Sequence, residues 1–120
     1  MTPPVFALLL ALTSDDRHGY ALMEDVAELT AGAVTLGPGT LYRSLQRMLV
    51  DGLIEELTEA VPVSEDRRAE RRRSYRITAA GRESVREQAR RLRILTDAAR
   101  ERGILDNAVA ADRLAREDTQ

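Results

Sequence analysis

The stretch LGPGTLYRSLQRML, residues 36–49, decides how the rest of the sequence is interpreted. Two glycines flank Pro38, and an amphipathic run begins directly after them. Apolar residues then recur three and four positions apart, which is the spacing of one face of an α-helix. This inner face consists of Leu41, Leu45, Met48 and Leu49. We therefore predict a helix from about Pro38 to Asp51, ended by Gly52.

The opposite face of this helix is polar and basic. It presents Gly39, Thr40, Arg43, Gln46 and Arg47. Arginine and glutamine side chains match the edges of guanine and adenine in the major groove of DNA. A glycine in the first turn leaves the free backbone N–H groups accessible to a phosphate, and a proline there loses no hydrogen bond. This stretch alone is equally compatible with a loop followed by a solvated surface helix.

Two further helices are predicted before this stretch. Thr2 followed by two prolines is typical of a helix N-terminus, and residues 5–12 after it are all apolar. The inward stripe consists of Val5, Leu8, Leu9 and Leu12. Phe6 and Leu10 lie off this stripe, so we expect a second subunit to cover them. After a turn, a second helix is predicted from about His18 to Ala31, with Gly32 as its stop.

The hydrophobic period changes after the third helix. Residues 53–61 and 72–78 are compatible with β-strands, and the polar segment between them completes a predicted hairpin with a long tip at 62–71. This hairpin carries the run RRAERRRSYR, residues 67–76. A charge run is usually a solvated face. In a winged helix, however, the hairpin lies beside DNA, so we predict phosphate or minor-groove contacts by Arg71, Arg72 and Arg73.

A long last helix is predicted after Thr78, which can cap it, with Glu83 early in the helix. Its apolar stripe is narrow, and consists of Val85, Ala89, Leu92, Leu95 or Thr96, and Ala99. A small domain cannot cover such a stripe along its whole length, so a partner helix from a second subunit is expected. Gly103 is predicted to end this helix, and residues 104–114 are predicted to form a shorter one.

This order of elements is the layout of a winged helix-turn-helix. The predicted fold class is mainly α, with a two-stranded β wing and a long C-terminal dimerisation helix. We expect a DNA-binding domain over residues 1–78 and a dimerisation helix and tail over residues 79–120.

Composition excludes several classes of site. The chain has 120 residues, no cysteine and one histidine, so disulfides and thiolate metal sites are ruled out and no metal or cofactor is predicted. His18 lacks an apparent nucleophile, so a capping or hydrogen-bonding role is expected and an enzyme is not. The apolar run at 5–12 is too short to span a bilayer and no basic residue precedes it, so a cytoplasmic protein is expected.

Charge is unevenly distributed along the chain. Residues 1–60 hold three arginines against nine acidic residues, a net charge of −6. Residues 61–100 hold twelve arginines against six acidic residues, a net charge of +6. A basic segment in a mildly acidic chain creates a local positive field, because binding depends on patches within a Debye length. The net charge of −2 therefore does not exclude a nucleic-acid partner.

Four motifs together resemble the PadR-like family of transcriptional regulators. They are HGY (18–20), PGTLYRSLQRM (38–48), DGLIE (51–55), and RRRSYRIT with AAG (71–81). The single long C-terminal helix is similar to the short branch of that family. The resemblance implies a homodimer that binds a near-palindromic DNA operator and usually represses transcription.

The resemblance also implies which residues contact DNA. The positions that match its motifs are Tyr20, Thr40, Tyr42, Arg43 and Arg73, whereas Gln46 and Arg47 come from the helical face alone. We expect the two tyrosines to donate to phosphates. Some relatives stack flat effectors on aromatic side chains at the dimer interface, and this chain has no aromatic residue after Tyr75. No effector pocket is therefore predicted.

A second hypothesis is a winged-helix module that binds protein and lacks sequence-specific DNA binding. The acidic first half of the chain and the negative net charge support it.

Overall fold

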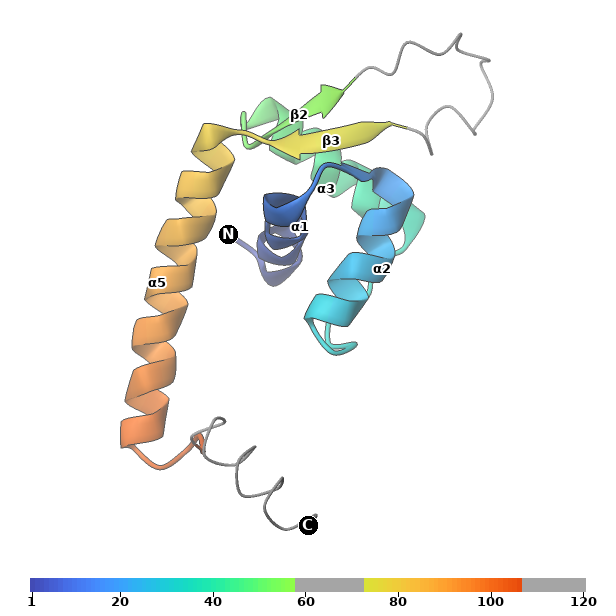
Figure 1. Ribbon diagram of the computed structural model, residues 1–120. Helices are drawn as coiled ribbons and strands as arrows, with labels where there is room; N and C mark the ends of the chain where they lie inside the picture. The colour runs from blue at the N-terminus through green and yellow to red at the C-terminus, as the bar shows by residue number, and fades with distance from the viewer. Residues whose placement is uncertain (58–72, 107–120) are drawn as a thin grey trace, which may run out of the picture. The chain divides into compact units, whose positions relative to one another are not determined.

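The computed structural model describes residues 1–57 and 73–106. In chain order, its elements are α1 (Pro3–Ser14), β1 (Arg17–His18), α2 (Gly19–Leu29), α3 (Pro38–Val50), β2 (Ile54–Leu57), β3 (Ser74–Ile77) and α5 (Ala79–Glu101) (Figure 1). They form two compact units, Met1–Gln88 and Ala89–Gln120, and α5 runs through the boundary between them. The predicted fold class is confirmed, with α2 and α3 as the helix-turn-helix and β2 and β3 as the strands of the wing.

The strands form one antiparallel sheet in the order β1-β3-β2. Strand β3 is central and pairs Ile77 with Ile54 on one side and Tyr75 with Arg17 on the other. The two-stranded wing was predicted, but β1 was not, because two residues are too short to show an alternating pattern. The Gly19 N–H extends this pairing by donating to the carbonyl of Arg73 at 3.1 Å. The start of α2 is thus fastened to the root of the wing.

One hydrophobic core holds the first unit together. Of the four residues predicted to form the inward face of α1, Leu8, Leu9 and Leu12 are fully buried, and Val5 is partly buried against the same core. The other elements contribute Leu22, Val26, Leu41, Leu45, Met48, Ile54, Tyr75, Ile77 and Val85. The three helices α1, α2 and α3 lie together beside the sheet, as Figure 1 shows. Within the described residues, no helix has the length and apolar character needed to cross a membrane.

Helices α2, α3 and α5 end in the same way. In each, the second residue after the helix has positive φ, and two backbone N–H groups donate back to carbonyls of the last turn. Gly52 has this position after α3 and Gly103 after α5, with φ of +74° and +73°. Both helix ends were predicted correctly. After α2, however, the position belongs to Ala31 at φ +50°, and the predicted stop, Gly32, is one residue further on.

Ala31→Gly is expected to stabilise the protein. A side chain at positive φ is strained by contact between Cβ and the backbone, and glycine removes that strain. We expect the free energy of unfolding to rise by about 0.5–1 kcal/mol, measured by urea denaturation. Ala33→Gly is the control, because Ala33 is an exposed neighbour without positive φ. An equal effect of both substitutions, or a loss of stability in Ala31→Gly, would contradict this prediction.

The start of α5 is tied to the end of α3. The Thr78 hydroxyl accepts a hydrogen bond from the Gly81 N–H at 3.1 Å, which confirms the predicted cap. The same hydroxyl donates to the Gly52 carbonyl at 2.6 Å, and the Thr78 N–H donates to the Leu53 carbonyl at 3.0 Å. Gly81 is consequently pressed against the backbone at Leu53. The predicted wing tip at 62–71 and the predicted terminal helix beyond Asp106 lie outside the described residues.

Candidate nucleic-acid interface

The outward face of α3 is free of packing contacts with the core. Gly39, Thr40, Arg43, Gln46 and Arg47 are all exposed, whereas Leu41, Leu45 and Met48 are buried on the opposite face. The N-cap residue is Gly37, which has no side chain to bond the first-turn N–H groups. Apart from its chain neighbours and the backbone of its own helix, a Cβ placed on Gly39 would meet no atom of the described residues within 4 Å. An anion therefore has open access to the N–H groups at the start of α3.

Each of the two arginines of α3 contacts a group four residues away in the chain. Arg43 Nε donates to the carbonyl of Gly39 at 3.3 Å. Arg47 Nε lies 3.3 Å from a carboxylate oxygen of Asp51, one turn further along. Both contacts are exposed, so water and phosphate compete for these guanidinium groups at little cost. The arginines are available for contact with another molecule.

The two tyrosines predicted to donate to phosphates differ in accessibility. Tyr20, in the first turn of α2, is 48% exposed. The Tyr42 hydroxyl oxygen is buried, and it lies against Gly19, where an added Cβ would be 3.3 Å away. Tyr42 therefore packs between α2 and α3, and its hydroxyl does not face the surface in this structure. The position of Tyr42 in α3 did not indicate that its hydroxyl is buried, because the ring reaches across to Gly19 of α2.

His18 links α2 to the sheet. Its Nδ1 lies 3.1 Å from the hydroxyl oxygen of Ser74, a buried residue at the start of β3. It makes no side-chain cap of α2. Of the two structural roles expected from the sequence, the hydrogen-bonding one is therefore observed.

The wing contributes Arg73 among the described residues. Arg73 precedes β3, its side chain is 52% exposed, and its Nε lies 3.2 Å from a carboxylate oxygen of Glu56 on β2. Arg71 and Arg72 lie outside the described residues. Of the three wing arginines predicted to contact DNA, Arg73 is the one among the described residues.

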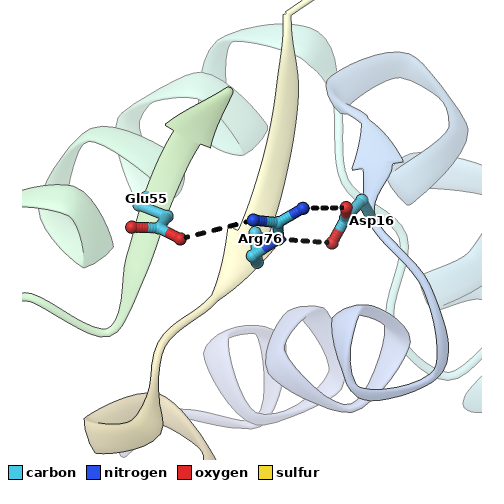
Figure 2. A network of polar contacts seen from close by, with 3 residues as sticks. All are labelled: Asp16, Glu55 and Arg76. Atoms are coloured by element: carbon cyan, nitrogen blue, oxygen red, sulfur yellow. Dashed lines mark hydrogen bonds and ion pairs between the residues drawn. The ribbon is translucent and has the colours of Figure 1, made fainter. Parts of the chain in front are cut away.

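An ion-pair network crosses the exposed face of the sheet (Figure 2). Arg76 on β3 donates two hydrogen bonds to Asp16, at 3.2 Å and 2.9 Å, and lies 4.0 Å from Glu55 on β2. The hydrogen bonds lower the pKa of Asp16 and raise the pKa of Arg76 relative to their ordinary values. The sequence did not indicate this network, because Asp16 and Arg76 are 60 residues apart and no local pattern relates them. It fixes the turn before β1 to the sheet.

The residues predicted to form a dimer interface fall into three groups. Val85 is 6% exposed and belongs to the core of the first unit, so its side chain is already covered within the chain. Phe6 and Leu10 are partly buried against the same core. In the second unit, Leu92 is 40% and Leu95 66% exposed, together with exposed Ala89 and partly buried Ala99. Among the residues predicted to form the interface, Leu92 and Leu95 are therefore the large apolar side chains that remain exposed.

Residues 8–87 match the model of the transcriptional regulator PadR-like family, which is two thirds of the chain and includes α2, α3 and both wing strands. The chain belongs to this family. The PadR-like family consists of transcriptional regulators and not of enzymes. The residues that first indicated the resemblance, HGY, PGTLY and RSYRIT, all fall inside the matched range.

Known structures share the fold of this PadR-like chain. A PadR family transcription regulator from Clostridium difficile R20291 superposes with a TM-score of 0.67 at 22% identity, covering 83% of this chain and 97% of that one. Bacillus subtilis PadR in complex with operator DNA gives a TM-score of 0.58 at 16% identity, covering 71% and 45%.

One sequence relative is an uncharacterised 37.1 kDa protein of transposon TN4556 from Streptomyces fradiae. It is 30% identical over 111 residues, which are 92% of this PadR-like chain and 29% of that protein. The chain thus spans less than a third of the length of this relative.

Proposed function

We propose that this chain is a cytoplasmic homodimeric repressor that binds a near-palindromic DNA operator. The observation that carries the proposal is α3, whose outward face is exposed, polar and basic while its inner face fills the core. A helix of this kind fits the major groove, whose width admits one α-helix. That Bacillus subtilis PadR, a member of the same family, was crystallised with operator DNA supports this use of the fold.

The proposed contacts divide into two kinds. Arg43, Gln46 and Arg47 would contact base edges and supply sequence discrimination. Tyr20, Thr40 and the Gly39 amide would bind phosphates and fix the register of the helix on the duplex. Arg73, with Arg71 and Arg72, would supply the salt-dependent part of affinity. The structure buries the Tyr42 hydroxyl, so in this proposal Tyr42 positions α3 and does not itself touch DNA.

The exposed apolar side chains of the second unit support the proposed dimer. Leu92 and Leu95 lie on a helix rich in charged residues, and water contact with them is unfavourable. Burial against a second copy, together with Phe6 and Leu10, would remove this exposure. We propose that residues 1–78 bind DNA and that the helix from residue 79 onward dimerises. Two copies of α3 would then enter successive major grooves, about 34 Å apart on the duplex.

The test is binding to the DNA upstream of the protein's own gene, compared with random DNA of equal length. The expected result is preferential binding to an upstream inverted repeat, with affinity for both DNAs falling steeply as salt rises. Absence of binding to either DNA at low and moderate salt would contradict the proposal. That result would favour a protein-binding module, which the −6 charge of residues 1–60 supports.

Gly39→Val tests the contact at the start of α3. We expect at least a tenfold loss of DNA affinity, because a branched side chain would hold the phosphate away from the first-turn N–H groups. The space around Gly39 is open, so the free energy of unfolding should change by less than about 1 kcal/mol. Filter binding and urea denaturation measure the two quantities. Parallel losses of binding and stability would mean that Gly39 serves only the fold.

A further inference from the structure

Two adjacent carboxylates on β2 are paired with two different arginines. Glu55 lies opposite Arg76 in the sheet and 4.0 Å from its guanidinium. Glu56, the next residue, lies 3.2 Å from Arg73. Neighbouring side chains of a strand point to opposite faces, so the two pairs lie on opposite faces of the wing. Only the second pair involves an arginine proposed to contact DNA.

The pair between Glu56 and Arg73 is accessible to solvent. The side chain of Arg73 is 52% exposed and that of Glu56 is 32% exposed. Ion pairs of such exposure add little to folding stability, because water screens both charges. They do alter the local potential, since one carboxylate cancels most of the field of the guanidinium beside it. We therefore expect this ion pair to change the affinity for DNA and to leave the free energy of unfolding almost unchanged.

We propose that Glu56 is an intramolecular counterion that limits how strongly the wing binds DNA. This proposal rests on the proposed function. A phosphate competes with this carboxylate for the charge of Arg73, and Glu56 remains near the bound phosphate as a like charge. Glu56 thus weakens the part of the affinity that does not depend on sequence. The contact between Arg47 and Asp51, 3.3 Å apart, repeats this arrangement on α3.

Glu56 should weaken the affinity for every DNA sequence by the same factor. Arg73 would bind a phosphate in operator and random complexes alike, and phosphate contacts carry no sequence information. Glu56→Gln is therefore expected to tighten binding to both DNAs by about two- to fivefold near 0.1 M salt, the range that exposed ion pairs allow. The slope of log affinity against log salt should become steeper by about one.

Glu55→Gln is a matched control. It makes the same change of charge, on the adjacent residue of the same strand, but on the face where Arg76 is also held by Asp16. We expect it to change DNA affinity less than Glu56→Gln does. A second test combines Glu56→Gln with Arg73→Ala, and the gain in affinity should disappear in that background. Glu56→Ala should reproduce the gain, since it removes the same carboxylate.

The outcomes separate this proposal from the proposed function. Suppose that the unmodified protein binds DNA but Glu56→Gln leaves the affinity unchanged, or raises it no more than Glu55→Gln does. The proposal about Glu56 is then overturned, and DNA binding stands. A gain that persists without Arg73 overturns it as well. If the unmodified protein binds no DNA at low salt, the proposed function itself fails. Circular dichroism on each variant checks that folding is unchanged.

Discussion

Gly81→Ala is expected to destabilise the protein by about 3 kcal/mol, a large share of the stability of a small domain. A methyl group at this position would overlap the carbonyl oxygen of Leu53 and lie 2.8 Å from Cγ1 of Ile77. The Leu53 carbonyl cannot easily move away, because it accepts the hydrogen bond from the Thr78 N–H. The start of α5 would have to separate from the end of α3.

The sign of this effect distinguishes packing from helix propensity. Glycine to alanine within a helix normally stabilises it by about 0.5–1 kcal/mol. Gly39→Ala is the matched control, because Gly39 is also helical but has open space around it. Urea denaturation followed by circular dichroism should show a large loss for Gly81→Ala and no loss for Gly39→Ala. Similar stability of the two variants would show that the close approach at Gly81 is not what requires glycine.

Arg43→Ala is expected to lower operator affinity about tenfold to a hundredfold, with a much smaller loss for random DNA. The reason is that one bidentate contact to a base edge distinguishes the correct base, whereas a phosphate contact is made on any sequence. Arg43→Lys should also lose discrimination, since lysine keeps the charge without the planar fork. Competition binding with operator and random duplexes measures the ratio of the two affinities.

Arg86→Ala is the control for the loss of one positive charge. Arg86 is exposed on α5 and pairs with Glu83 at 2.8 Å, and it is not among the proposed DNA contacts. Its removal should leave the ratio of operator to random affinity unchanged. If Arg43→Ala also left that ratio unchanged, Arg43 would be a phosphate contact and base discrimination would depend on other residues.

The elements with a strong local pattern could be predicted from the sequence. Helix α3 spans Pro38–Val50 where a helix ending at about Asp51 was predicted, since its apolar spacing and both its end signals lie within the segment itself. The cap of α5 by Thr78 is likewise local. The exposed face of α3 follows from the same periodicity, because burial of one face of a helix exposes the other.

Features that depend on contacts distant in sequence could not be predicted. Strand β1 forms only because β3 lies beside it. The Tyr42 ring is covered because it reaches Gly19 of another helix. The bond between Asp16 and Arg76 joins residues 60 positions apart. The same is true of Glu56 and Arg73, whose pairing depends on the register of the hairpin.

The central place of β3 in the sheet has a mechanical consequence. On one side β3 pairs with β2, and on the other it pairs with β1, next to which the Gly19 N–H bonds to the Arg73 carbonyl. A force that tilts the wing is therefore transmitted through β3 to the first turn of α2, where Tyr20 lies. Because Tyr42 packs against Gly19 in that same turn, the displacement is passed on to α3 as well. We therefore expect the wing and the helix-turn-helix to move together when either of them is displaced.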